Sequence, residues 1–577
     1  MKRFSLLLAL SIAAPRLAVP QERWQARSMV ISSQGIAATS QTLASQAAAQ
    51  ILARGGSAVD AAIAANAVLS VVEPMMCGIG GDLFAIHWDA KTDKLTGINA
   101  SGPTPKGMTI NALKAKGHYN MPGSGIHTVS VPGAVDGWAK MHQKFGRLPW
   151  ADLFQPAIHH ARNGFPVTEI IQYDWSHTIG KLDADSNARK VYLINGRAPA
   201  VGEIFRNPQL ANAFEAIAQT GRDAFYKGPI AQSILKTSKR LGGTLTADDL
   251  AEFHSEWINP IATTYRGWKV SEMPPNGQGI AVLMMLNIME KFPIDEKQPL
   301  SADAFHWKIE AQKLAYQDLR AYNADPRAVS VPTKAMLSKD YATGRAKQIE
   351  LGKAGCSFSA GELEKGSHTV YLSVVDKEGN IVSWIQSISD LWGSGVVVDD
   401  FGFQLHDRAG GFTFDPQHPN VLAPGKRPYH TIIPGFMEKG DQKIGFGIMR
   451  GANQAMAHAQ FVSNIVDHGM NIQAALEAPR FTRQTLGGCD VLIESRVPPA
   501  EREDLTKRGH YLDVRAEYSG QMGGGQAVLT DTTKKVHYGA SSPRKDGAAI
   551  PEPIEFWKST ARPAVKVQPA PAESRRN

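Results

Sequence analysis

The segment 366–385 constrains the fold more than any other part of the chain. Its first half, 366–376, is rich in β-branched and aromatic residues, which predicts a strand that opens at Thr369. The charged Gly/Asn sequence at 377–380 is typical of a turn, and the apolar run 381–385 predicts a returning strand. We therefore expect an antiparallel hairpin, a unit that in most proteins is only part of the scaffold.

The character of the chain changes at this hairpin. Before it, apolar residues recur at helical spacing in five stretches, which are 40–54, 58–70, 209–220, 280–291 and 304–322. Ser57, with Asp60 three positions later, is expected to cap the second of these helices. From Thr369 to about Phe436 we expect mainly strands. Beyond them we expect a strand over 443–451 and helices over 454–467 and 472–478. The pattern predicts an α+β protein.

Length and composition narrow the range of functions. A chain of 577 residues exceeds what one core usually holds, so we expect two cores or one large layered core. The formal net charge of +8 comes from scattered basic residues, without a basic run flanked by aromatic residues, so no nucleic-acid partner is expected. Beyond the N-terminus no apolar stretch has the length of a membrane span, so no membrane partner is expected.

Both ends of the chain have a distinct composition. Met1, Lys2 and Arg3 precede a short apolar stretch, so residues 1–25 resemble a secretory signal peptide. A periplasmic or secreted location is therefore expected; Pro15 and Arg16 make a poor cleavage site, and a cytoplasmic location is the alternative. The tail 561–577, rich in Pro, Ala and charge, is expected to be disordered.

Cysteine and metal-ligand patterns are sparse. Cys77, Cys356 and Cys489 lie far apart, an odd number that does not make a disulfide framework but leaves room for one disulfide. No group of His, Cys, Asp and Glu has the spacing of a zinc site in the sequence. We therefore expect neither a metal nor another cofactor.

Several short motifs occur together in one order. They lie at 53–62, 78–82, 131–138, 223–228, 273–280, 424–428 and 538–544. With Thr-Val-Tyr-Leu-Ser-Val-Val-Asp at 369–376, these motifs resemble the γ-glutamyltranspeptidase family of N-terminal-nucleophile hydrolases, over about residues 29–551. The resemblance implies a four-layer αββα sandwich. It also implies self-cleavage between His368 and Thr369 into a large subunit (26–368) and a small subunit (369–577) that stay together as an intertwined heterodimer.

The chemistry that this resemblance implies suits the residues present. A hydroxyl is a poor nucleophile until a base removes its proton. Once Thr369 is an N-terminus, its own α-amine, with a pKa near 8, can act as that base toward a small amide substrate. Ser387 stands where the family places a hydroxyl that hydrogen-bonds the nucleophile. Arg450 and Gly451 stand where the family has two glycines whose N–H groups form the oxyanion hole.

The departures from the family pattern fall at the positions expected to bind substrate. Asn99 replaces the family's arginine, Ser389 replaces an asparagine and Arg408 replaces a glutamine. Gly411 replaces an aspartate, and His430 and Thr431 replace two serines. The features that recognise a free glutamyl head group are therefore mostly lost, a pattern similar to the amidohydrolase and acylase branch of the family. Arg408 and Arg450, both expected near the pocket, favour an acyl donor that ends in a carboxylate.

Three functions remain open at this point. The favoured one is a self-processing amidohydrolase or acyltransferase that works through an acyl-Thr369 intermediate. The alternatives are a glutathione hydrolase or γ-glutamyl transpeptidase, and an unprocessed relative retained for binding. The sequence leaves open the acyl group, the leaving group and the choice between hydrolysis and transfer.

Overall fold

The computed structural model describes residues 25–356, 367–485 and 488–556. The predicted signal peptide, apart from Gln25, and the predicted disordered tail lie outside these residues. No helix in the described ranges combines the length and apolar character needed to cross a membrane.

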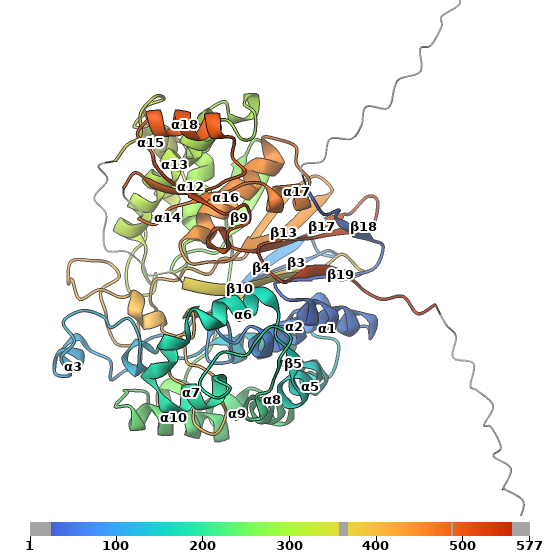
Figure 1. Cartoon of the computed structure of the whole chain (residues 1–577), viewed down its shortest axis with the longest axis vertical. Coiled ribbons are helices and arrows are strands. Elements are labelled where there is room, and N and C mark those ends of the chain that lie inside the picture. Colours follow the sequence, from blue (N-terminus) through green and yellow to red (C-terminus); the bar gives the residue numbers. More distant parts are fainter. Residues whose placement is uncertain (1–24, 357–366, 486–487, 557–577) are drawn as a thin grey trace, which may run out of the picture.

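Two large antiparallel sheets form the centre of the molecule (Figure 1). The strands of the first, in spatial order, are β1 (Val30–Ser32), β18 (Val536–Ser541), β17 (Gly525–Asp531), β13 (Gln442–Ile448), β12 (Gly435–Lys439), β9 (Trp268–Glu272) and β8 (Ile261–Tyr265). Those of the second are β19 (Ala548–Pro551), β2 (Ile36–Thr39), β10 (Ser367–Val375), β11 (Ile381–Asp390), β3 (Asp82–Asp89), β4 (Lys94–Ala100) and β7 (Glu256–Ile258). The α+β class is thus confirmed.

Smaller sheets lie outside this pair. One joins β14 (Phe481–Thr482), β15 (Asp490–Glu494) and β16 (Tyr511–Arg515), and the other joins β5 (Phe165–Pro166) and β6 (Ile204–Phe205).

Helices cover the outer face of each large sheet (Figure 1). Over the sheet that contains β10 lie α1 (Thr42–Ala53), α2 (Ala58–Val72), α4 (Ala134–Phe145), α5 (Gln155–Asn163) and α8 (Pro208–Thr220). Over the other lie α12 (Gly279–Met289), α13 (Ala302–Tyr322), α16 (Asn453–Val466) and α17 (Ile472–Glu477). The remaining α-helices are α3 (Ile110–Lys114), α6 (Glu169–Ser176), α7 (Ser186–Tyr192), α9 (Arg222–Tyr226), α10 (Pro229–Arg240), α11 (Ala247–Ala251), α14 (Thr333–Met336), α15 (Lys339–Ala346) and α18 (Pro499–Lys507). The order of layers is helices, sheet, sheet, helices.

Local sequence signals explain why the helices begin where they do. The Ser57 side chain accepts a hydrogen bond from the Asp60 N–H, and the Asp60 carboxylate accepts one from the Ser57 N–H, which makes the predicted capping box. Every residue of α2 is buried, and its many alanines let it pack closely against α1 and the sheet. The other four predicted N-terminal and central helices, and the two after residue 453, are also present.

The predicted hairpin is confirmed as β10 and β11, which pair with Tyr371 opposite Ile385. Successive side chains of β10 point to opposite faces, as a strand requires. Leu372 packs in the core beneath the helices, and Tyr371 packs in the core between the two sheets. β10 begins at Ser367, so Thr369 lies inside the strand rather than at its start.

The prediction of strands up to Phe436 is wrong for residues 391–434. This stretch holds a short 3₁₀ helix (Arg408–Gly411) and isolated bridges, such as the one between Val397 and Gln404. Glycines at left-handed φ angles, among them Gly395 (φ 75°) and Gly402 (φ 60°), turn the backbone before a strand can extend. The stretch instead contributes much of the wall of the cavity described below.

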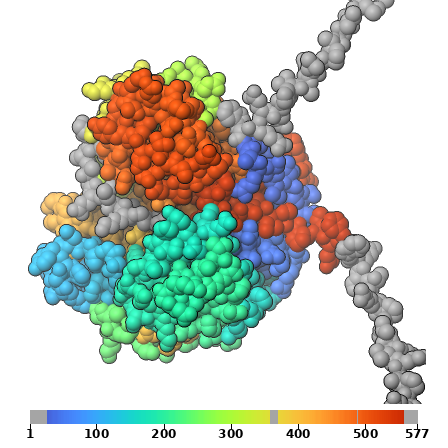
Figure 2. Space-filling view, viewed as in Figure 1, coloured from blue at the N-terminus to red at the C-terminus, as the bar shows by residue number. Residues whose placement is uncertain are grey.

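Both large sheets combine strands from the two sides of Thr369. In the first, β9 precedes Thr369 in sequence and pairs with β12, which follows it. In the second, β2 lies between β10 and β19, the last strand of the chain. Figure 2 shows N-terminal and C-terminal segments side by side at one edge of the molecule. The parts before and after Thr369 are therefore interleaved, and neither has a complete core of its own.

Candidate active site

Thr369 occupies an irregular position in β10. The pairing of β10 with β11 shifts register between His368 and Val370, which leaves Thr369 at a β-bulge. Its side chain is 1% exposed. A bulge leaves one residue out of the regular ladder and re-aims its side chain.

Two side chains from distant parts of the sequence reach the Thr369 hydroxyl. Thr369 Oγ1 lies 3.4 Å from Ser387 Oγ on β11 and 3.3 Å from Gln454 Nε2 on α16. The Gln454 Oε1 atom accepts a hydrogen bond from the Ile433 N–H, which fixes the amide so that its NH₂ group donates to Thr369. Ser387, predicted to hydrogen-bond the nucleophile, is thus brought next to Thr369. Gln454 was missed, because no local pattern indicates a partner 85 positions away.

Arg450 and Gly451 form the loop between β13 and α16. Both have left-handed backbone angles, with φ of 94° and 49°. The Gly451 carbonyl accepts hydrogen bonds from Gln278 Nε2 (2.8 Å) and from the Gln454 N–H (3.2 Å), which holds the loop against the start of α16. Consecutive N–H groups in such a turn, at a helix N-terminus, suit an oxyanion. Sequence reasoning selected this loop but not Gln278.

Arg408 lies between Ser387, which contacts Thr369, and Thr431. Its guanidinium donates to Ser387 Oγ at 3.3 Å and to Thr431 Oγ1 at 2.9 Å, and the residue is 4% exposed. Ser387 Oγ also accepts a hydrogen bond from the Ser389 N–H at 2.7 Å. The residues Thr369, Ser387, Arg408 and Thr431 thus form one continuous chain of polar contacts.

A cavity of about 740 Å³ opens beside this chain. Four of the residues expected to bind substrate line it, namely Ser389, Arg408, Gly411 and Thr431. A Cβ atom added at Gly411 would meet its nearest neighbour, the Tyr429 carbonyl oxygen, at 3.7 Å, so the position is not crowded. The cavity is large enough for a small acyl group and part of its leaving group.

The cavity wall also carries two neighbouring carboxylates that sequence reasoning missed. Asp390 and Asp407 both line the cavity, and Lys181 Nζ lies 3.4 Å from the first and 2.9 Å from the second. Burial, with the adjacent Asp407 charge, raises the pKa of Asp390 to about 7. The wall therefore combines a fixed positive charge at Arg408 with a carboxyl group that titrates near neutral pH.

The other two residues expected to bind substrate lie behind the cavity wall. Asn99 Nδ2 donates to Asn276 Oδ1 at 2.9 Å, and its Oδ1 accepts from Ser101. His430 Nε2 lies 2.9 Å from Asp82 Oδ2 in the interior. Burial, aided by the Arg408 charge, lowers the pKa of His430 to about 3, so its imidazole is neutral near pH 7. Neither side chain is among those lining the cavity.

The Arg450 side chain takes a different direction from Arg408. Its guanidinium donates to the Gly520 carbonyl at 3.0 Å, and Arg450 is not among the described residues that line the cavity. The two arginines therefore do not share one cavity, and the expectation that both lie near the pocket holds only for Arg408, which contacts Ser387. Any contribution of Arg450 to the site is therefore expected from its backbone.

Comparisons with known proteins identify the family of this chain. The model of the family described as gamma-glutamyltranspeptidase matches residues 44–552. The glutathione hydrolase-like YwrD proenzyme of Bacillus subtilis is 34% identical, with 90% of this chain and 99% of that protein covered. The oxamate amidohydrolase proenzyme of Klebsiella pneumoniae is 32% identical, with 90% and 98% covered.

A solved structure supports the same relationship. The crystal structure of cephalosporin acylase from Bacillus halodurans is 40% identical, covers 93% of this chain and 99% of its own, and superposes with a TM-score of 0.85. The family model spans most of the chain, and the two relatives are covered almost completely. The chain is therefore an enzyme of the γ-glutamyltranspeptidase family, with that family's N-terminal-nucleophile hydrolase fold.

Proposed function

We propose that this enzyme cleaves itself before Thr369 and then cleaves an amide substrate through an acyl-Thr369 intermediate. In the first stage Thr369 Oγ1 attacks the carbonyl carbon of His368, and the bond from that carbon to the Thr369 nitrogen breaks as the nitrogen gains a proton. Water then hydrolyses the resulting ester, which leaves a carboxylate at His368 and a free amine at Thr369.

One observation carries this proposal. The Thr369 hydroxyl is buried at a β-bulge, within 3.4 Å of Ser387 Oγ and 3.3 Å of Gln454 Nε2. Gln454 also joins Thr369 to the Arg450–Gly451 turn, because its backbone N–H donates to the Gly451 carbonyl at 3.2 Å. A nucleophile and a hydroxyl partner thus meet, one side chain away from the turn expected to supply backbone donors. Several relatives of this length are named proenzymes, which supports self-cleavage.

The second stage uses the amine that the first stage releases. The α-amine of Thr369 takes the proton of its own hydroxyl, and Oγ1 attacks the substrate amide. The N–H groups of Arg450 and Gly451 stabilise the oxyanion, the leaving amine takes the proton, and the acyl group stays on Thr369. Water regenerates the enzyme by hydrolysis, or an amine accepts the acyl group.

Arg408 supports a narrower choice of substrate. A guanidinium that is 4% exposed in the cavity wall suits an acyl donor ending in a carboxylate, such as the monoamide of a dicarboxylic acid. The relative named oxamate amidohydrolase acts, by its name, on a compound of this kind. We therefore propose glutaryl or shorter carboxyacyl amides as the preferred donors.

A second candidate is a glutathione hydrolase or γ-glutamyl transpeptidase. It is favoured by Asp390 and Asp407, whose carboxylates line the same cavity and suit an α-ammonium group, and by the name of the YwrD relative. Glutaryl and γ-glutamyl amides with one common leaving group differ only in that ammonium. We expect a higher kcat/KM for the glutaryl compound. A clear preference for the γ-glutamyl amide, unaltered in Asp390→Asn, would refute our choice of substrate.

Self-cleavage has a direct test. We expect N-terminal sequencing of the smaller fragment to read Thr-Val-Tyr-Leu, and we expect Thr369→Ala to stay a single chain because it lacks the attacking hydroxyl. Thr369→Ser keeps a hydroxyl and serves as the matched control, which should still be cleaved. Cleavage of Thr369→Ala at the same bond would refute the mechanism. A folded wild-type protein that is never cleaved would support the alternative of an unprocessed binding relative.

We also propose that the protein is exported to the periplasm or secreted. The basic and apolar N-terminal segment supports this location, and so does a disulfide between Cys356 and Cys489, a bond that persists mainly in oxidising compartments. Fractionation of cells into periplasm and cytoplasm, followed by immunodetection, tests it.

A further inference from the structure

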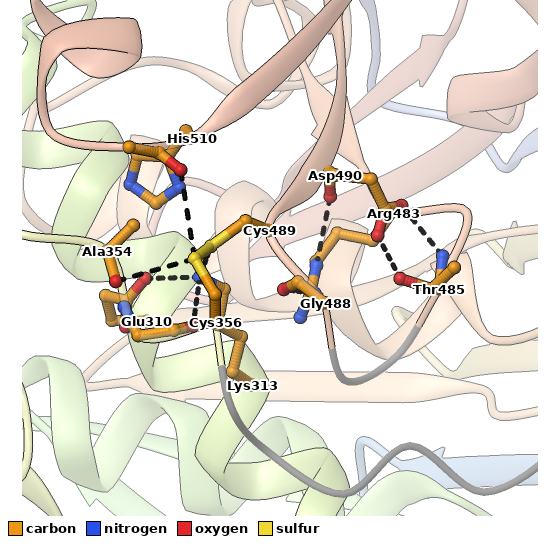
Figure 3. The surroundings of a disulfide bond; sticks show 12 residues. Glu310, Lys313, Ala354, Cys356, Arg483, Thr485, Gly488, Cys489, Asp490 and His510 are labelled. Atoms are coloured by element: carbon orange, nitrogen blue, oxygen red, sulfur yellow. Dashed lines mark hydrogen bonds and ion pairs between the residues drawn. A yellow bond between two sulfur atoms is a disulfide. The ribbon is translucent and has the colours of Figure 1, made fainter.

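A disulfide joins two segments on opposite sides of the active-site threonine. Cys356 lies at the end of the described segment that follows α15, and Cys489 lies just before β15 (Figure 3). The two residues are 133 positions apart, and their Cα atoms are 4.9 Å apart. Such a distance is typical of a disulfide. Cys77, the third cysteine, is buried and unpaired within the described ranges.

Because the two cysteines lie on opposite sides of Thr369, self-cleavage changes what the disulfide connects. Before self-cleavage it closes a loop inside one chain. Cleavage between His368 and Thr369 cuts that loop, with Cys356 on the large fragment and Cys489 on the small one. We propose that the Cys356–Cys489 disulfide is a covalent tether between the two subunits of the mature enzyme. This inference rests on the self-cleavage proposed above.

Two residues of α13, which precedes the cut, contact the chain at or next to both cysteines. Lys313 Nζ on α13 lies 2.9 Å from the Gly355 carbonyl and 3.9 Å from Cys489 Sγ (Figure 3). Glu310, one turn earlier on α13, accepts the Gly355 N–H at 3.1 Å. The residue before Cys356 is thus fixed on the same helix that contacts Cys489.

Segments before and after Cys489 make further contacts across the cut. Arg508 donates to Asp303 Oδ1 at 2.7 Å, and its carbonyl accepts the Ala354 N–H at 2.7 Å. Phe305 on α13 packs edge to face against Phe481, with ring centroids 5.7 Å apart. The tether therefore belongs to a packed interface that exists before cleavage, and the two cysteines meet because that interface is built from both sides.

The same corner brings together three side chains of metal-ligating type, His306, Glu310 and His510. The Lys313 ammonium lies 2.6 Å from Glu310 Oε1, so a cation already neutralises that carboxylate. His306 Nδ1 lies 2.8 Å from His510 Nε2, and His306 Nε2 lies 2.8 Å from the Glu350 carbonyl. Ion pairing and hydrogen bonds account for this group, and we assign no metal to it.

A tether of this kind changes how the subunits are held. Without it, the fragments of the mature enzyme rely on noncovalent contacts alone. With it, a fragment that loosens stays at a high effective concentration near its partner, on the order of millimolar for short links. Forming the bond removes two electrons and two protons from the two thiols, and a disulfide-bearing oxidant accepts them as it becomes a dithiol.

The test is denaturing gel electrophoresis of the purified full-length protein, alkylated with iodoacetamide to block thiol exchange. We expect one band the size of the whole chain without reductant and two bands with dithiothreitol, which passes two electrons to the disulfide. Cys489→Ser and Cys356→Ser should each give two bands without reductant. Cys77→Ser, the matched control, should behave like the wild type.

Each outcome decides the proposal. Two bands from wild-type protein without reductant would overturn the tether while leaving self-cleavage intact. A single band under both conditions means that no cut occurred, which overturns the proposed self-cleavage and the tether with it. Mass spectrometry of a non-reduced protease digest gives an independent check, because it should contain a peptide pair linked through Cys356 and Cys489. Absence of that pair, with both free peptides found alkylated, would also overturn the proposal.

Discussion

Replacing Arg408 with methionine removes a guanidinium from the cavity wall while keeping an unbranched side chain. Arg408 is 4% exposed, so water screens its charge weakly. A hydrogen bond to a charged partner contributes about 1.5–3 kcal/mol. At about 1.4 kcal/mol for each factor of ten, losing one such contact with a substrate carboxylate corresponds to roughly a 10- to 150-fold loss in kcat/KM.

The assay compares two anilides with the same leaving group, a glutaryl anilide and a butyryl anilide without the terminal carboxylate. Arg408 also donates to Ser387, so Arg408→Met is expected to lower kcat for both substrates. The ratio of the two kcat/KM values cancels this shared effect and isolates recognition of the carboxylate. We expect that ratio to fall by roughly 10- to 150-fold.

Arg408→Lys is the matched control for this experiment. It keeps a positive charge but loses the planar group that reaches Ser387 and Thr431 together, so we expect an intermediate ratio. The reasoning would be refuted if Arg408→Met left the ratio of glutaryl to butyryl activity unchanged, because the carboxylate would then be bound elsewhere or not at all.

Four further predictions concern the site. Because the pKa of Asp390 is raised to about 7, a rise in pH through that value adds a negative charge to the cavity; KM for a glutaryl amide should rise with it, and Asp390→Asn should flatten this pH profile. The folded state should also lose stability as pH rises from 3.8, the ordinary pKa of an aspartate, toward 7, because over this range the Asp390 carboxyl ionises in the unfolded chain but stays protonated in the folded one. Thermal denaturation of Asp390→Asn at a series of pH values should lack this trend. Gln454→Leu removes the donor to Thr369 and should lower kcat by roughly 2- to 10-fold with little change in KM, measured by steady-state kinetics on the mature enzyme. Gly411→Asp places a carboxylate in an uncrowded part of the cavity, and in competition assays it should shift the preference from glutaryl toward γ-glutamyl amides.

The sequence by itself determined the features that depend on near neighbours. The capping box of α2 joins Ser57 and Asp60, three positions apart, and the turn at 377–380 sets the register of β10 against β11. These structures form from hydrogen bonds between residues close in sequence, so their residue types reveal them. The family motifs around Thr369 likewise mark this residue as the candidate nucleophile.

Only the tertiary structure decided the features that depend on distant segments. Gln454 reaches Thr369 from 85 positions away, Asp390 and Asp407 meet beside Lys181, and Cys356 pairs with Cys489 across 133 positions. The stretch 391–434 carries β-branched residues, yet its glycines turn it around the cavity instead of into a sheet. Local propensity is worth at most about 1 kcal/mol per residue, whereas packing two sheets face to face buries many side chains at once. Where the chain passes around the site, long-range packing therefore outweighs the local pattern.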